Sequence, residues 1–126
     1  MSEKLASKRH VFNIKDAPWR VYTLQGKPQK DCHWANLSYD DKSGEGCFLF
    51  RFGAGAHSIP HEHLGFEEFY VLEGEIEDND GYVYHPGDFV SLDPGSRHSS
   101  HSDDGAIVAV FVRGGFRTLE WAKLDD

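Results

Sequence analysis

The sequence predicts an all-β domain, either a sandwich or a barrel, on three observations. Strand-like segments are short and alternate in polarity, as in residues 47–52, where Phe48, Phe50 and Phe52 share one face and Arg51 lies on the other. Turn signals containing Gly or Pro recur at intervals of roughly eight to twelve residues. No segment shows a convincing helical periodicity. A chain of 126 residues fits one domain with a core of its own.

The expected elements follow one another closely along the chain. The expected strands are residues 11–14, 20–24, 33–38, 47–52, 66–72, 75–77, 82–85, 88–92 and 106–112. Residues 119–124 could form at most one helical turn. The first 18 residues carry weak signals, and we expect either an arm that packs on a partner subunit or a frayed terminus. Residues 19–126 would form the β domain.

The charge balance excludes several kinds of partner. Asp and Glu number 21 against 13 Lys and Arg, which gives a formal net charge of −8. Binding along nucleic acid needs a basic face, and docking on an anionic membrane needs basic clusters. No apolar run of the length needed to span a bilayer occurs. We therefore expect neither a nucleic-acid nor a membrane partner.

The amino terminus and the cysteines indicate a cytoplasmic protein. The first ten residues are polar and lack the apolar region of a secretory signal. Cys32 and Cys47 do not form a CxxC pair. Two reduced thiols are the simplest interpretation, with a disulfide or a redox role as the alternative.

Histidine is abundant: the chain has eight, and five of them lie within residues 57–98. His61 and His63 are two residues apart, and such residues on a strand point to the same face. Both imidazoles can therefore reach one ion. Glu67 begins the next apolar segment, and His98 follows a Pro-Gly turn, so each could bring a further ligand.

Three imidazoles and one carboxylate suit a divalent first-row metal ion. An octahedral ion held by four such groups would keep two positions for water or substrate. The alternative is a set of scattered surface histidines, which the spacing of His61 and His63 disfavours. We expect one divalent transition metal, namely Fe, Mn, Ni or Zn.

The same residues match the first motif of the cupin superfamily at every position. The matching residues are Gly55, His61, His63, Glu67 and Gly74. The second cupin motif is matched in part, twelve residues later, by Gly87, Gly95 and His98. Asp93 stands where that motif has Pro, and Ser102 stands where it has Asn, so the turn departs from the pattern while the histidine is kept.

Residues 65–74 and 94–98 resemble the cupin domain of ChrR-type anti-sigma factors, a group that also contains free-standing proteins. The resemblance covers residues 53–112 well and the ends poorly. It implies a jelly-roll barrel (a double-stranded β-helix) with one metal inside, held by His61, His63, Glu67 and His98. Some relatives resemble dioxygenases that cleave carbon–carbon bonds in diketone-like substrates.

Several other residues could serve the same site. His57 shares strand parity with His61 and could lie near the mouth of the barrel as a base or substrate contact that does not bind the metal itself. Arg51 and Arg113 could anchor an anionic substrate, although a surface ion pair is the commoner role. Period-two apolar residues mainly build the barrel core, and those near the metal would shape a substrate pocket. The candidate substrate contacts are Phe50, Phe52, Phe69 and Val110.

Two functions follow from these residues. The first is a metalloenzyme acting on a small diketone, hydroxyketone or carboxylate, with a dioxygenase favoured over a decarboxylase or isomerase. The second is a non-catalytic, metal-dependent metabolite sensor. The cupin and its arms account for all 126 residues, so we expect no separate sigma-binding domain. Open strand edges favour a homodimer.

Overall fold

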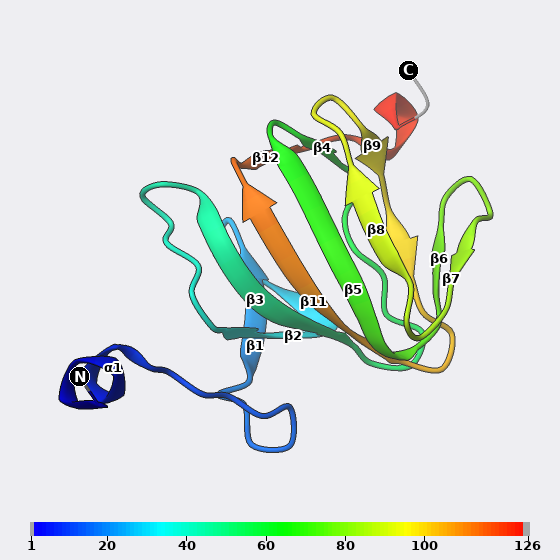
Figure 1. Ribbon diagram of the computed structural model, residues 1–126. Helices are drawn as coiled ribbons and strands as arrows, with labels where there is room; N and C mark the ends of the chain where they lie inside the picture. Colours follow the sequence, from blue (N-terminus) through cyan, green and yellow to red (C-terminus); the bar gives the residue numbers. More distant parts are fainter. Residues whose placement is uncertain (1, 125–126) are drawn as a thin grey trace.

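Six antiparallel strands form the main sheet of the computed structural model, which describes residues 2–124 (Figure 1). In sheet order the strands are β1 (Arg20–Leu24), β2 (Lys27–Asn36), β3 (Glu45–Phe52), β11 (Ala106–Arg113), β5 (Phe66–Gly74) and β8 (Phe89–Leu92). The longest ladders join β11 to β3 on one side and to β5 on the other. These three strands form the centre of the sheet.

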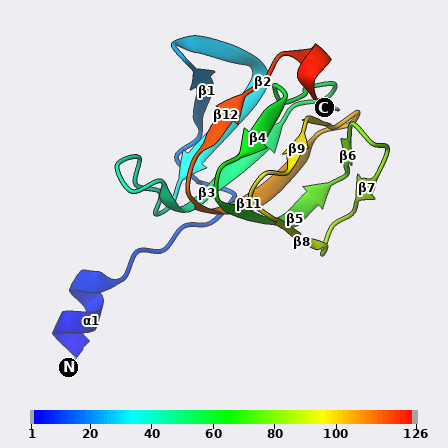
Figure 2. The same ribbon diagram turned by 90° about the horizontal axis from the view of Figure 1, so that it is seen from above.

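Two three-stranded sheets complete the jelly roll (Figure 2). One contains β10 (Ser100–His101), β6 (Ile76–Asp78) and β7 (Val83–Tyr84). The other contains β12 (Phe116–Thr118), β4 (His61–His63) and β9 (Arg97–His98). The predicted all-β jelly roll is therefore confirmed, since the chain consists mainly of antiparallel strands.

The period-two pattern separates the two faces of the main sheet. Phe50 and Phe52 on β3 and Val108 and Val110 on β11 face the interior and are buried in one core cluster. Leu49 points to the outer face. It packs there with Ala17 and Ala35, so a short stretch of the amino-terminal region covers part of that face.

Most expected strands form, and their bounds move by a few residues. Residues 11–14 were expected to be a strand, and this is wrong: they include an irregular stretch and the beginning of a turn. Val11 is 80 % exposed, so the apolar run lacks the neighbouring strand that would complete its hydrogen bonds. The single turn expected at residues 119–124 corresponds to the 3₁₀ helix η1 (Trp121–Lys123).

The amino-terminal region contains a helix that the sequence pattern did not indicate. Helix α1 (Ser2–Lys8) lies apart from the sheets, at the end of an extended connection (Figures 1 and 2). Leu5 on this helix is 56 % exposed, so no apolar stripe is buried against a partner element. Such a short helix lacks the periodicity that allows detection from sequence. Within residues 2–124, no helix has the length and apolarity needed to cross a bilayer.

Candidate metal centre

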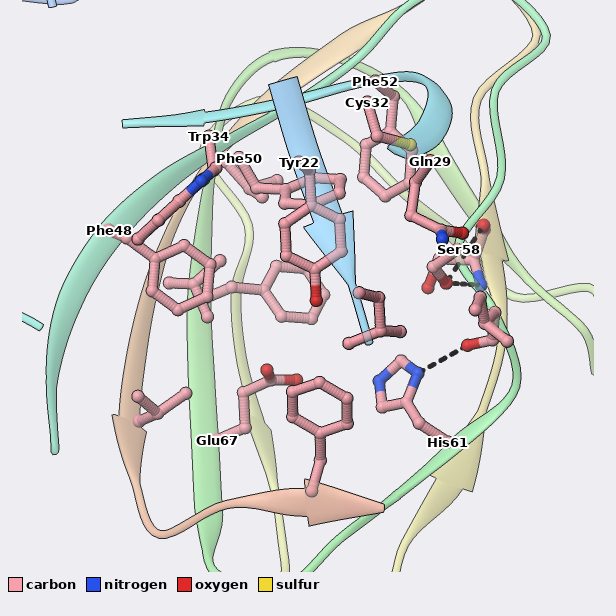
Figure 3. A pocket seen from close by; sticks show the side chains of 18 of the residues that line it. Tyr22, Gln29, Cys32, Trp34, Phe48, Phe50, Phe52, Ser58, His61 and Glu67 are labelled. Carbon is pink, nitrogen blue, oxygen red and sulfur yellow. Dashed lines mark hydrogen bonds between the residues drawn. The ribbon is translucent and has the colours of Figure 1, made fainter. Parts of the chain in front are cut away.

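Strand pairing brings the four expected ligands together. His61 and His63 lie on β4, and His61 is the register partner of His98 on the adjacent strand β9. Glu67 lies near the start of β5 and faces the barrel interior, opposite His61 (Figure 3). One ligand atom from each of His61, His63, Glu67 and His98 lies within 4.8 Å of the others. The cluster is therefore compact enough to surround one ion.

Each imidazole is fixed through its Nδ1 atom. Nδ1 of His61 lies 2.7 Å from the carbonyl oxygen of Ile59. Nδ1 of His98 lies 3.1 Å from Oδ1 of Asp78. A carbonyl and a carboxylate only accept hydrogen bonds, so both Nδ1 atoms carry the proton and donate. In the neutral rings, the Nε2 lone pairs are left to face the centre of the cluster.

His63 is oriented in the same way through a hydroxyl group. Its Nδ1 lies 2.9 Å from Oγ of Ser96, and that hydroxyl donates its own proton to the carbonyl oxygen of Asp93. The Ser96 oxygen therefore accepts from Nδ1 of His63. All three imidazoles present Nε2 inward, which is the arrangement that hydrogen-bonded ligands of a metal adopt.

The inward atoms fit a cation. Nε2 of His61 lies 3.0 Å from Nε2 of His98, and both are acceptors when the rings are neutral. Nε2 of His63 is buried and lies 2.7 Å from Oε2 of Glu67, yet the two atoms do not meet in hydrogen-bond geometry. Four electron-rich atoms thus face one another at short range. A positive ion at their centre would relieve this repulsion.

The electrostatics keep two of the donors, His61 and Glu67, in metal-binding form. Burial, together with the neighbouring His98, lowers the pKa of His61 to about 4, so this ring is neutral at pH 7. Burial alone would raise the pKa of Glu67, but the three surrounding imidazoles outweigh it and hold that pKa below the usual value. The carboxylate is therefore ionised.

Asp78 contacts the cluster directly, although the sequence analysis did not single it out. It lies at the end of β6, is buried, and accepts hydrogen bonds from His98, Ser100 and the Tyr84 hydroxyl. Burial lowers the pKa of His98, whereas the hydrogen bond and charge of Asp78 raise it, and the net direction is upward. Asp78 thus orients His98 and increases its electron density, as carboxylates behind metal-bound histidines do.

A cavity of about 340 Å³ opens beside the cluster (Figure 3). Three members of the cluster line it, namely His61, Glu67 and His98. The four candidate substrate contacts, Phe50, Phe52, Phe69 and Val110, also line it. An ion held by the cluster would therefore face an apolar space, as in many small-molecule sites.

Other candidate residues lie farther from the cluster. His57 lines the cavity as an exposed residue, packs edge-on against Trp121 and is not part of the four-residue group, so its role as a base stays a prediction. Arg51 stacks over Trp19 with its guanidinium carbon 4.5 Å from the ring centroid. Arg113 pairs with Glu68 at 3.5 Å. Neither arginine lines the cavity.

Both cysteines are free thiols. Cys32 is buried at the cavity wall, and burial raises its pKa to about 11. A thiol with so high a pKa is protonated and unreactive at neutral pH. Cys32 therefore packs as a small apolar side chain.

The fold and the histidine cluster define the class of protein. The sequence profile of the ChrR cupin-like domain matches residues 7–116, and the chain belongs to this family. Comparison with curated proteins gives no significant match.

Three solved structures illustrate the likeness. An RmlC-like cupin from Ralstonia eutropha JMP134 is 22% identical, with a TM-score of 0.75 over 90% of this chain and 73% of that chain. A candidate acetylacetone dioxygenase from Methylibium petroleiphilum PM1 is 14% identical, with a TM-score of 0.74 over 90% of this chain and 83% of that chain. The anti-sigma factor ChrR of Rhodobacter sphaeroides, solved with SigE, is 20% identical, with a TM-score of 0.63 over 79% of this chain and 51% of that chain. At these identities the comparisons establish a shared fold.

Proposed function

We propose that the protein is a mononuclear metalloenzyme that acts on a small oxygenated substrate, with oxidative cleavage of a diketone-like compound as the favoured reaction. His61, His63, Glu67 and His98 would hold one divalent transition metal ion. The observation that carries the proposal is the position of this cluster: three of its members line an apolar cavity large enough for a small molecule. A metal with a purely structural role would not need that opening.

The ion would supply Lewis-acid chemistry toward a chelating oxygen and, with iron, reactivity toward dioxygen. The protein's own residues set the conditions for that chemistry. The Glu67 carboxylate offsets part of the charge of a divalent ion, and Asp78 behind His98 keeps that ring correctly oriented. Phe50 and Phe69 exclude water from the substrate side and lower the local polarity, which strengthens electrostatic interactions in the site.

Metal analysis tests the ligand set. The purified protein is expected to carry about one ion per chain, and His61→Ala or His98→Ala is expected to reduce the content well below that level. His85→Ala is the matched control, because His85 is exposed and pairs with Glu75 at 3.1 Å outside the cluster. Full occupancy in both ligand variants would contradict the assignment.

Oxygen uptake tests the reaction. Iron-loaded protein supplied with a panel of diketones is expected to consume dioxygen, and His61→Ala is expected not to. Glu67→Gln should retain some metal but alter the rate, because a neutral amide replaces an ionised ligand. Metal-loaded protein that binds diketones without any turnover would refute the dioxygenase.

A non-catalytic, metal-dependent sensor is the second candidate, and membership in the ChrR cupin-like family favours it. A sensor would bind a small molecule at the same centre and change its conformation or partners without product formation. Saturable binding, with no consumption of dioxygen and no change in the bound compound, would support this alternative over the enzyme.

We also propose that the protein is a cytoplasmic homodimer in which residues 1–18 act as an arm. The first 18 residues contain four Lys or Arg against two Asp or Glu, whereas the whole chain has a net charge of −8. Helix α1 of this basic arm lies apart from the sheets of its own chain (Figure 1), a position that suits contact with an acidic second copy.

A further inference from the structure

The cavity beside the candidate metal centre is rich in aromatic side chains. Trp34, Tyr39 and Phe48 form one cluster in its wall, with ring centroids 5.9 Å apart for Trp34 and Phe48 and 5.9 Å apart for Tyr39 and Phe48. Both pairs are edge-on. Such walls favour a flat, conjugated ligand, because aromatic side chains can pack against its ring in stacked or edge-to-face geometry.

The charged side chains around the same cavity disfavour an anionic ligand. Among residues 2–124, none of those lining it is Lys or Arg, and its one carboxylate belongs to Glu67. Arg51 and Arg113 on the main sheet do not line the cavity, because Arg51 stacks on Trp19 and Arg113 pairs with Glu68. The net charge of −8 disfavours anionic ligands further. The substrate should therefore carry no additional negative group.

Tyr22 on β1 brings an unused hydrogen-bond donor into this space. Its ring is fixed edge-on against Phe50, with centroids 5.2 Å apart, and its hydroxyl points into the cavity on the side of Glu67 (Figure 3). Among the described residues the hydroxyl has no hydrogen-bond partner, whereas the buried Tyr84 hydroxyl donates to Asp78. A half-buried phenol without a partner is suited to donate to a ligand oxygen.

The backbone that faces Tyr22 is irregular. The pairing of β1 with β2 shifts register between Val21 and Thr23, so Tyr22 lies opposite a bulge in β2. Asp31 within that stretch of β2 has a left-handed backbone, with φ of 57°. Bulges of this kind redirect side chains and are frequent beside functional sites.

We propose that the ligand of this cavity is a neutral, enolisable dicarbonyl compound with an aryl substituent, and that Tyr22 donates a hydrogen bond to one of its oxygen atoms. The aryl ring lies beside Trp34 and Phe48, and the dicarbonyl group faces the cluster that includes His61 and Glu67. The inference rests on the proposed function and narrows its substrate class, since carboxylates are excluded and simple alkyl diketones are disfavoured.

The test compares three probes by calorimetry with protein loaded with Zn²⁺, which binds without redox turnover. The probes are pentane-2,4-dione, 1-phenylbutane-1,3-dione, and 2,4-dioxo-4-phenylbutanoate, in which a carboxylate replaces the methyl group of the second probe. The phenyl dione is expected to bind about tenfold more tightly than pentane-2,4-dione and about tenfold more tightly than the carboxylate.

Two variants test the residues. Tyr22→Phe keeps the ring against Phe50 and removes only the donor, and should weaken binding of the phenyl dione about tenfold. It should also shift the absorption band of the bound dione, a change that a merely structural role would not produce. Trp34→Leu should reduce the preference for the phenyl dione about fivefold. Tyr70→Phe on the outer face of the sheet, where Tyr70 is 39 % exposed, is the matched control.

The outcomes separate this inference from the proposed function. Equal affinity for 1-phenylbutane-1,3-dione and pentane-2,4-dione would overturn the inference. So would a Tyr22→Phe variant with full metal content that binds the phenyl dione with wild-type affinity and an unchanged absorption band. Either result would leave a diketone-binding metal site intact. Tighter binding of 2,4-dioxo-4-phenylbutanoate than of 1-phenylbutane-1,3-dione would overturn the inference that the ligand is neutral. Failure of all three probes to bind protein with one metal per chain would overturn the inference together with the diketone-cleaving reaction proposed above.

Discussion

The three imidazoles of the cluster point inward because each has a specific partner for Nδ1: the carbonyl oxygen of Ile59, the hydroxyl of Ser96 and the carboxylate of Asp78. These partners determine which ring nitrogen each histidine presents to the centre of the cluster before any ion binds. Preorganisation of this kind reduces the cost of binding and makes the outer partners nearly as important as the ligands.

Asp78→Asn is expected to weaken metal affinity about tenfold or more, since the amide can still accept from His98 but no longer carries a negative charge. Competition with a chromophoric chelator measures the change. Asp80→Asn is the control, because Asp80 is exposed and accepts only from the Tyr82 backbone amide among the described residues. Equal affinities in the two variants would mean that Asp78 does not tune the site.

The cluster itself was predictable, whereas its supporting residues were not. His61 and His63 share a face through the two-residue period of a strand, and the cupin motif added Glu67 and His98. Asp78 lies in a stretch that reads as a turn, and its role depends on β6 pairing with β10, which places it near His98. Such pairing between distant segments leaves no local pattern in the sequence.

At the scale of the elements, close contacts between neighbouring segments of backbone restrict which residue can occupy the contact position. Gly74 ends β5 with φ of 75°, and a Cβ atom there would collide with the backbone carbonyl of Gly105. The same strand carries Glu67, so the position of β5 affects the position of this carboxylate in the cluster. Glycine at this position is therefore a steric requirement of the barrel.

Gly74→Ala is expected to lower the free energy of unfolding by about 3 kcal/mol, because it combines backbone strain with a steric clash. Gly81→Ala shares the positive φ but meets open space, and should cost only about 1 kcal/mol. Chemical denaturation of both variants measures the difference. A loss for Gly74→Ala no larger than that for Gly81→Ala would argue against the tight contact.

Long, regular strands were the elements that the sequence predicted best. Residues 47–52 and 106–112 alternate clearly and correspond to β3 and β11. The two-residue strands β9 and β10 and the short β12 are too brief to show a period, and they exist because neighbouring strands pair with them. Residues 11–14 show the reverse case, in which an apolar run has no partner strand and remains irregular.

At the scale of the whole molecule, we expect a dimer of twice the 14.3 kDa chain mass by light scattering. Reversing the charge of the arm with Lys4→Glu, Lys8→Glu and Arg9→Glu should shift the protein toward the monomer, because the arm would then repel an acidic partner. The control reverses three exposed lysines elsewhere, Lys27, Lys30 and Lys42, with the same change in net charge. A dimer unaffected by the arm variant would exclude the arm from the interface.

The metal is also expected to contribute to the stability of the whole domain. Binding to the native state alone adds about 4 kcal/mol when the free ion is a thousandfold above its dissociation constant. Removal of the ion with a chelator should therefore lower the melting temperature by about 10 °C. The His61→Ala variant should melt at the same temperature with and without chelator.

Anomalous diffraction from a crystal of the metal-loaded protein tests the central claim most directly. The account predicts one strong peak about 2.0–2.2 Å from Nε2 of His61, His63 and His98 and from a carboxylate oxygen of Glu67. Absence of a peak among these four side chains, or a fully occupied peak elsewhere in the protein, would contradict it.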